Sequence, residues 1–326
     1  MDSILITGGA GFIGSHLVER LLRDGKRVVV LDSFDPYYDP ALKRANLRTA
    51  AQASGFRLVE GDIRDESLLA GLLSAERFQA VIHLAARAGV RPSIADPATY
   101  ADVNVTGTIR VLEACRRAGV RRFLFGSSSS VYGDNEKVPF AEDDPVDRPV
   151  SPYAATKRAG ELIAWNYHRL SGMEVACLRF FTVFGPRQRP EMAIRKFARL
   201  IAAGEEVEQY GDGTSARDYT YVSDVVEGVV RALERCRAFH IWNLGGSRTT
   251  TLAELVEKIG RGLETRPRIR RRPAQPGDVE RTWADVRRAR LELSWEPTVN
   301  LDRGLELFLQ WFRSQGADRH IGKETT

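Results

Sequence analysis

ILITGGAGFIGSH, residues 4–16, joins a short apolar run to a glycine-rich turn and the start of an amphipathic helix. The apolar run is typical of a buried parallel strand. Glycines recur at positions 8, 11 and 14, a spacing that lets the turn approach a pyrophosphate and the helix pack on the strand. The helix N-terminus that follows favours an anion. The stretch therefore predicts a dinucleotide site with contacts from Gly8, Gly11, Phe12, Ile13 and Gly14.

Similar apolar runs recur along the chain, and helical patterns separate them. We expect strands at residues 27–31, 56–60, 80–84, 121–125 and 175–179, and longer helices at residues 12–23, 98–118 and 152–170. Strands that alternate with helices at this spacing indicate right-handed βαβ units. The chain is therefore predicted to be an α/β protein with a Rossmann-type doubly wound parallel sheet.

The regular alternation stops near residue 180. We expect a dinucleotide-binding domain over residues 1–180, with some return of the chain from about 217–245. A smaller C-terminal α/β substrate lobe is expected mainly over residues 181–326. Five arginines at residues 266–272 are interpreted as a solvated strand with one face near substrate phosphates. A nucleic-acid patch is the alternative for this run.

The composition limits the class of protein. Of the 326 residues, 43% are hydrophobic and 28% are charged, and the net charge is only +5. These values are typical of a soluble globular protein and argue against dedicated nucleic-acid binding. The apolar runs are too short to cross a bilayer, and no basic segment of a signal peptide precedes Ile4, so no membrane role is expected.

Cysteine and histidine show no pattern of metal ligands. Cys115, Cys177 and Cys236 are scattered, and we interpret them as small buried residues in a reducing compartment, which predicts a cytoplasmic protein. The five histidines have no paired spacing, so no metal site is expected. His83 lies within an apolar run and is expected to be packed rather than catalytic.

Residues at the ends of the expected strands predict further cofactor contacts. Asp32 stands where an acid hydrogen-bonds the adenosine ribose, and a helix or turn cap is the alternative. A carboxylate at this position repels a 2′-phosphate, which favours NAD over NADP as the cofactor. Asp62 is expected to meet the adenine amino group or to cap its own loop, and small residues near 85 let backbone pass close under the cofactor. The predicted contacts outside the glycine turn are Asp32, Lys43, Asp62, Ile63, Leu84, Ala85, Ala86, Tyr153 and Lys157.

SPYAATK, residues 151–157, predicts the start of a helix, with Ser151 as the N-cap and Pro152 in the first turn. Tyr153 and Lys157 are four residues apart and so share one face of that helix. The lysine ammonium is expected to favour the tyrosine phenolate, which makes Tyr153 a candidate base for a sugar hydroxyl. The alternative is a surface pair without a catalytic role. Hydroxyl side chains at residues 127–132 follow another strand, where open α/β sheets place their sites.

These motifs together resemble the extended short-chain dehydrogenase/reductase family, specifically its nucleotide-sugar epimerases. The resemblance runs from Ile4 to about Leu309 and rests on TGGAGFIGSH, LAA, SSSSVYG, SPYAATK, RDYTYVSD and PGDV followed by TWAD. FDPYYDPALKR at 34–44 and LRFFTVFGPRQRPEMA at 178–193 are similar to UDP-glucuronate 4-epimerases. UDP-glucose 4-epimerases usually carry asparagine in place of Thr182.

The resemblance implies roles for single residues. It implies that Tyr153 is the base, that Lys157 is its electrostatic partner and a ligand of the nicotinamide ribose, and that Ser128 bridges to the 4-OH of the sugar. It further implies that the uridine diphosphate is held by Arg217 and Asp278, and the substituent at C5 by Thr182, Arg189 and Ser129. A homodimer through the helices within 98–118 and 152–170 is also implied. The implied activity is NAD-dependent conversion of UDP-glucuronate to UDP-galacturonate through a transient 4-keto sugar.

Three alternatives to this activity stay open. The chain could be a UDP-glucose 4-epimerase. A 4,6-dehydratase or a UDP-glucuronate decarboxylase is a second possibility, but relatives of those kinds carry acids at the positions of Ser129 or Ser130. A non-catalytic NAD sensor is the third, and such relatives lose the tyrosine or the lysine that this chain has at Tyr153 and Lys157.

Overall fold

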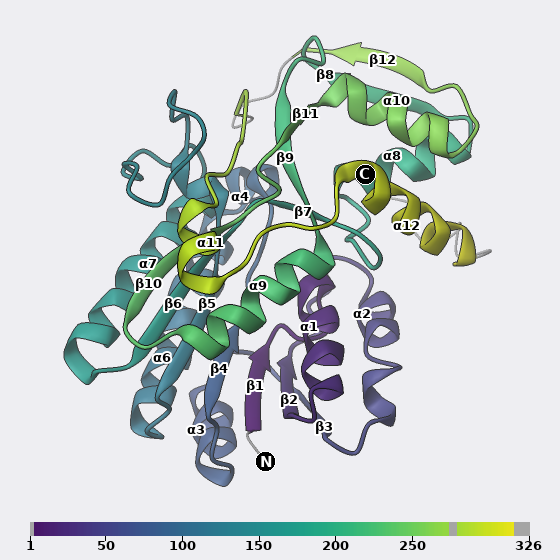
Figure 1. Ribbon diagram of the computed structural model, residues 1–326. Coiled ribbons are helices and arrows are strands. Elements are labelled where there is room, and N and C mark those ends of the chain that lie inside the picture. Colours follow the sequence, from purple (N-terminus) through teal and green to yellow (C-terminus); the bar gives the residue numbers. More distant parts are fainter. Residues whose placement is uncertain (1–2, 274–278, 316–326) are drawn as a thin grey trace.

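A computed structural model of the chain describes residues 3–273 and 279–315. Its larger part is built on a seven-stranded parallel sheet with the strand order β10-β6-β5-β4-β1-β2-β3 (Figure 1). The strands are β1 (Ser3–Thr7), β2 (Arg27–Asp32), β3 (Phe56–Glu60), β4 (Ala80–His83), β5 (Arg122–Ser128), β6 (Glu174–Phe180) and β10 (Phe239–Leu244). This sheet confirms the predicted Rossmann-type α/β fold.

Side chains alternate between the two faces of the sheet along each strand, and helices cover both faces. In β1, Ile4 and Ile6 belong to one core, to which α1 (Phe12–Arg23) and α9 (Val222–Arg235) contribute. Leu5 belongs to the other core, to which α3 (Glu66–Ala75), α6 (Gly107–Arg117) and α7 (Pro152–Ser171) contribute. The two sets of helices flank the sheet in Figure 1. Burial on both faces explains why the strands are continuous apolar runs in the sequence.

The helix predicted over residues 98–118 is interrupted by a wide turn. The structure has α5 (Pro97–Ala101), a π-helical segment η2 (Asp102–Thr106) and then α6. Within the π segment, Asn104 is only 2% exposed, and its amide accepts from Arg87 N–H (2.8 Å) and donates to the Arg87 carbonyl (2.9 Å). Single π turns often mark functional sites. Here the side chain of Asn104 in the wider turn fixes the backbone of the loop after β4.

The strand order reverses between β1 and β4. From β1 the chain moves outward to β2 and β3, and it then crosses back to β4 on the other side of β1. The loops after these two strands therefore diverge and leave a crevice at the carboxyl end of the sheet, where open α/β sheets bind ligands. The predicted glycine turn and the LAA segment form the two sides of this crevice.

The second part of the structure comprises two small sheets and three helices. Strands β7 (Thr182–Phe184), β9 (Ala216–Tyr221) and β11 (Thr249–Thr251) form one sheet, and β8 (Glu206–Tyr210) pairs with β12 (Arg268–Arg272). The helices are α8 (Ala193–Ala202), α10 (Leu252–Gly262) and α12 (Leu301–Ser314). In the sequence, α9 and β10 fall between β9 and β11, but β10 is a strand of the large sheet and α9 packs on that sheet (Figure 1). The exact division into domains stays a prediction.

Short elements complete the described chain. They are α2 (Pro40–Asn46), η1 (Ala50–Gln52), α4 (Val90–Ala95), η3 (Ser129–Tyr132) and α11 (Arg287–Leu293). In β12, Arg268 and Arg272 form ion pairs with Glu206 and Glu208 of β8, in agreement with a solvated strand. No helix within the described residues has the length and apolar character that a membrane span requires.

Candidate active site

A cavity of about 370 Å³ opens at the carboxyl end of the large sheet. Its walls come from the loops after β1, β2, β4 and β5, from the start of α7, and from β7 with the loop that follows it. All predicted cofactor contacts line it: Gly8, Gly11, Phe12, Ile13, Gly14, Asp32, Lys43, Asp62, Ile63, Leu84, Ala85, Ala86, Tyr153 and Lys157. Four of the predicted substrate residues line the same cavity, namely Ser128, Ser129, Thr182 and Arg189. The cavity therefore brings the two predicted sets of residues together.

The glycine turn has the close backbone contacts that a dinucleotide cradle needs. Gly8 has a φ of +72°, and a Cβ on it would lie 2.6 Å from the Ala85 nitrogen. A Cβ on Gly14 would lie 2.4 Å from the Gly8 carbonyl oxygen. Side chains at either position would push the helix and the opposite loop apart. At Gly11, which lines the cavity, only the Gly8 carbonyl would touch such a Cβ, at 3.2 Å, so this turn fits a pyrophosphate.

Asp32 is held in place by the turns on both sides. Its carboxylate accepts hydrogen bonds from Ala10 N–H and Phe34 N–H, both at 2.9 Å. Burial raises the pKa of Asp32, and the two N–H donors act in the opposite direction. Lys43 also lines the cavity and donates to the Asp35 carbonyl at 2.7 Å, while burial lowers its pKa. The acid and the lysine together form a polar end of the cavity that fits a ribose.

Asp62 caps its own loop. It accepts from Arg64 N–H at 2.8 Å and forms an ion pair with the Arg64 guanidinium at 2.6 Å. The hydrogen bond from the Arg64 side chain is the main cause of the lowered pKa of Asp62. Because Asp62 also lines the cavity, a contact with adenine stays a prediction.

The start of α7 places the tyrosine and the lysine. The Ser151 hydroxyl accepts from Ala154 N–H at 3.1 Å, and Pro152 occupies the first turn, as predicted. Lys157 is 5% exposed, and its ammonium group donates to the Gly126 carbonyl of β5 at 2.7 Å. Burial lowers the pKa of Lys157 to about 8. The lysine is thus tied to the strand that carries Ser128.

The pKa of Tyr153 is raised rather than lowered in this structure. Burial is the largest cause, while a hydrogen bond with Ser128 and the charge of Arg189 lower the pKa. The predicted lowering by Lys157 is therefore wrong for the protein alone. The physical reason is that the side chain loses hydration, whereas the lysine ammonium is directed at the Gly126 carbonyl.

A buried ion pair joins α7 to β6 near the candidate base, and a hydrogen bond joins the same part of α7 to β5. Glu161 of α7 accepts from the Ser127 hydroxyl at 2.6 Å and from two nitrogens of Arg179, both at 2.9 Å. The Glu161 and Arg179 side chains are 0% and 1% exposed. Bidentate pairs of this kind have a defined geometry. The pair fixes the Glu161 carboxylate, which in turn holds the end of β5 through the Ser127 hydroxyl, next to Ser128.

The substrate side of the cavity contains one of the two arginines in the PRQRP loop. Arg189 lines the cavity, and its Nε lies 3.2 Å from a Glu191 carboxylate oxygen. Arg187 is directed away, to Glu19 of α1 at 2.6 Å. Thr182, at the start of β7, lines the cavity as well. Of the two candidates, only Arg189 can reach a ligand beside Tyr153.

Arg217, which is predicted to hold the uridine diphosphate, is not among the residues that line this cavity. Arg217 of β9 donates to the carbonyls of Ala216 (3.0 Å) and Glu280 (3.3 Å). Asp278 lies outside the described residues. Their roles stay predictions.

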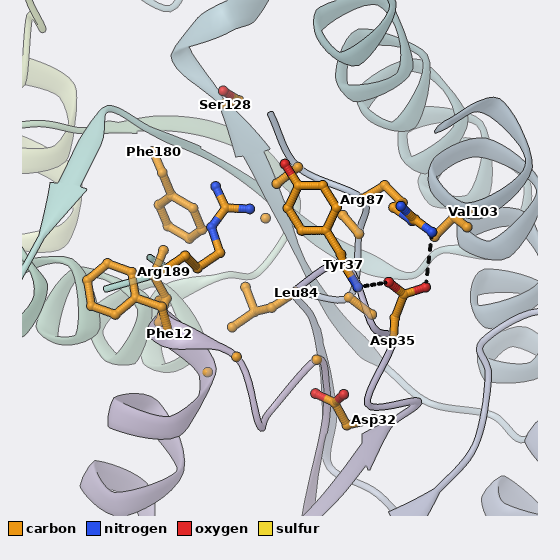
Figure 2. A pocket seen from close by; sticks show the side chains of 18 of the residues that line it. Phe12, Asp32, Asp35, Tyr37, Leu84, Arg87, Val103, Ser128, Phe180 and Arg189 are labelled. Atoms are coloured by element: carbon orange, nitrogen blue, oxygen red, sulfur yellow. Dashed lines mark hydrogen bonds and ion pairs between the residues drawn. The ribbon is translucent and has the colours of Figure 1, made fainter. Parts of the chain in front are cut away.

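Among the other residues that line the cavity, Arg87, Asp35 and Tyr37 form a group to which no sequence motif assigns a role. Arg87 and Asp35 form an ion pair at 3.3 Å, and Tyr37 stands beside them (Figure 2). In the sequence, these residues are indicated by the aromatic, turn-rich segment 33–40 and by a charged residue directly after LAA. Their meeting depends on the conformation of two loops, which strand patterns do not predict.

Comparisons with known proteins agree with this geometry. The model of the NAD dependent epimerase/dehydratase family matches residues 4–245. UDP-glucuronate 4-epimerase 3 of Arabidopsis thaliana is 41% identical over 329 residues, which cover 95% of this chain and 76% of the plant protein. The structure of Bacillus cereus UDP-glucuronic acid 4-epimerase in complex with UDP-glucuronic acid and NAD has a TM-score of 0.91 at 34% identity, covering 96% of this chain and 99% of that chain. A UDP-glucose 4-epimerase from Thermotoga maritima with UDP-glucose has a TM-score of 0.89, with the same identity and coverage.

Proposed function

The chain belongs to the NAD-dependent epimerase/dehydratase family, and on this premise we propose that it converts UDP-glucuronate to UDP-galacturonate by inverting C4 of the sugar. Its cofactor is NAD. One observation carries the proposal: Arg189 and Thr182 line the same cavity as Tyr153 and Ser128. A guanidinium and a hydroxyl suited to a carboxylate thus lie beside an acid-base pair suited to a sugar hydroxyl.

When bound, NAD supplies the hydride chemistry that converts C4 to a ketone and back. The residues of the chain handle the proton. Tyr153, as the phenolate, accepts the proton of the 4-OH, and Ser128, which hydrogen-bonds Tyr153, also hydrogen-bonds the sugar oxygen. Lys157 contributes positive charge one helical turn away. Because the proton returns to the sugar in the second half of the reaction, Tyr153 ends each turnover in its initial state.

The substrate carboxylate has to be held during the reaction. A 4-ketone of a glucuronate is a β-keto acid, which loses CO2 when the breaking C–C bond lies parallel to the carbonyl π system. An arginine fork fixes a carboxylate at two points and so keeps that bond out of alignment. Arg189 is the candidate for this role, with Thr182 as a second donor.

The serines that follow β5 argue against the other reactions of this family. Elimination of water needs an acid-base pair beside the sugar. Ser129 lines the cavity, and the Ser130 hydroxyl accepts from Ser128 at 3.1 Å. These hydroxyls support epimerisation over dehydration or decarboxylation.

We also propose a homodimer through α6 and α7. Both helices pack on the same face of the large sheet, and both expose apolar side chains to the outside. Ile109 is 39% exposed, Leu162 48% and Trp165 43%. Monomeric proteins usually cover such neighbouring apolar side chains.

The matched pair Arg189→Ala and Arg187→Ala tests the proposed function. Loss of a charge-assisted bidentate contact is expected to reduce kcat/KM for UDP-glucuronate roughly 10- to 100-fold in Arg189→Ala. The same variant should bind UDP-glucose as the wild type does, and it should release some decarboxylated UDP-4-keto-pentose. Arg187→Ala removes an arginine of the same loop outside the cavity together with its ion pair to Glu19, so any loss in this control should be equal for the two sugars. In Arg189→Ala, an equal loss on both sugars with no decarboxylated product would place Arg189 on the nucleotide and favour a UDP-glucose 4-epimerase.

A further inference from the structure

Tyr37 lies where three loops of the cavity meet. Its ring centroid is 5.9 Å from the guanidinium carbon of Arg189 and 5.6 Å from that of Arg87. Figure 2 shows the ring between the two arginines, with the Arg189 guanidinium in the space between Tyr37 and Phe180. The ring thus links the loop after β2 to the loop that carries the proposed carboxylate ligand.

The position of the Tyr37 ring is fixed by hydrogen bonds at both ends of the residue. At the backbone, Tyr37 N–H donates to the Asp35 carboxylate at 2.8 Å, and the same carboxylate pairs with Arg87. At the ring, the Tyr37 hydroxyl is hydrogen-bonded to Tyr100. Tyr100 is 1% exposed and donates to the Ala88 carbonyl at 3.0 Å. Tyr37 is therefore part of the rigid wall and not a mobile surface side chain.

Arg189 is held much less firmly by its other contacts. Its Nε pairs with Glu191 at 3.2 Å, but the Glu191 side chain is 41% exposed, and exposed ion pairs contribute little to order. An arginine side chain has many rotamers, and holding it in one of them is unfavourable in entropy. The face of an aromatic ring attracts a guanidinium and limits these rotamers. The Tyr37 ring is thus the best-fixed partner of Arg189 in the cavity.

We propose that Tyr37 is a positioning residue that orients Arg189 and thereby sets the preference of the site for an acidic sugar. This inference rests on the proposed function. A neutral sugar makes no ion pair with Arg189, so a disordered guanidinium weakens its binding little. A glucuronate needs both donors of the fork at once, so the same disorder weakens its binding strongly.

The experiment is a double-mutant cycle between Tyr37 and Arg189. The variants are Tyr37→Leu, which removes the ring, Tyr37→Phe, which keeps it, Arg189→Ala, and the double variant Tyr37→Leu/Arg189→Ala. For each, KM and kcat are measured with UDP-glucuronate, the inhibition constant is measured with UDP-glucose, and released NAD is assayed after denaturation. Tyr37→Met replaces Tyr37→Leu in the cycle if the leucine variant does not fold.

Tyr37→Leu should raise KM for UDP-glucuronate about tenfold, the effect of losing a partly desolvated cation–π contact. The kcat, the inhibition constant of UDP-glucose and the NAD content should stay within about twofold. Tyr37→Phe keeps the ring but loses the hydrogen bond to Tyr100, so its KM should lie between those of the wild type and Tyr37→Leu. In the Arg189→Ala background, removing the ring should change KM for UDP-glucuronate less than twofold, because Tyr37 acts through the arginine.

Two results would overturn the assignment, and they separate it from the proposed function. In the first, the wild type converts UDP-glucuronate, but the effects of the two single variants on KM multiply in the double variant, or Tyr37→Leu weakens the binding of both sugars or of NAD equally. Only the role of Tyr37 is then wrong. If the wild type does not convert UDP-glucuronate at all, the proposed function fails, and this inference fails with it.

Discussion

Tyr153 has the opposite pKa shift to the one that a base needs. Burial raises the pKa, and the lysine one turn away is engaged with the Gly126 carbonyl. Ser128 and Arg189 are the described groups that act in the other direction. A base needs the phenolate, so the hydrogen bond with Ser128 and the charge of Arg189 are the contacts that favour this role of Tyr153.

The first prediction concerns this residue. Tyr153→Phe should reduce kcat at least about 10²-fold, the usual contribution of a general acid-base group. NAD should stay bound, because the hydroxyl and not the ring is removed. Steady-state kinetics and an assay of released dinucleotide measure the two effects. Near-normal turnover in this variant would show that another group is the base.

The second prediction concerns the contribution of His83 to the stability of the fold. It is 1% exposed and bonded to the hydroxyls of Thr7 (2.7 Å) and Thr108 (3.0 Å), and it is packed, as the sequence predicts. Burial, and then the charge of Lys157, lowers its pKa to about 3. An unfolded histidine has a pKa of about 6.5, so between pH 6.5 and 3 the unfolded chain binds the extra proton. Stability from His83 is therefore present above this range and is lost as the pH falls through it.

Replacement of His83 by glutamine, which keeps partners for both threonines, should remove this pH dependence. The loss of free energy of unfolding between pH 7 and pH 4.5 should be smaller in His83→Gln by roughly 3 kcal/mol. Denaturant titration at the two pH values measures it. Equal losses in variant and wild type would mean that His83 is protonated in the folded protein.

At the scale of elements, helix α7 carries both the candidate base and exposed apolar side chains. Its first turn places Tyr153 and Lys157, and its exposed side carries Leu162 and Trp165. A dimer on that side would hold α7 from outside while Glu161 holds it from inside. Assembly and catalysis would then depend on the same helix.

The third prediction tests this assembly. Leu162→Arg places a charge in the proposed interface and should convert the dimer to a monomer at micromolar concentration. Leu291→Arg is the control, because Leu291 is 81% exposed on α11 and lies outside α6 and α7. Sedimentation velocity distinguishes the two states. A monomeric wild type, or an unchanged dimer in Leu162→Arg, would refute the proposed interface.

Strand ends explain how much of the site the sequence could predict. Gly8, Asp32 and Ser128 stand at the carboxyl ends of parallel strands, which must meet at one edge of the sheet. Tyr37 could not be placed in this way, because its position depends on an Asp35 turn and on a hydrogen bond to Tyr100 of another helix. The π turn at Asn104 also escaped prediction, since its sequence has an ordinary helical pattern.

At the scale of the whole molecule, the sugar side of the cavity is fastened to the cofactor side. His16 of α1 is hydrogen-bonded to the Pro186 carbonyl at 2.9 Å, and Arg187 pairs with Glu19 of the same helix. The loop that carries Arg189 is thus tied to the helix that begins at the glycine turn.

We propose that an acidic sugar is the substrate. The purified wild-type protein, with NAD supplied, is incubated separately with UDP-glucuronate, UDP-glucose and UDP-N-acetylglucosamine, and the products are separated by anion exchange. We expect that UDP-glucuronate is converted to a mixture with UDP-galacturonate and that the two neutral sugars are converted slowly or not at all. Rapid conversion of UDP-glucose to UDP-galactose, with UDP-glucuronate unchanged, would contradict it.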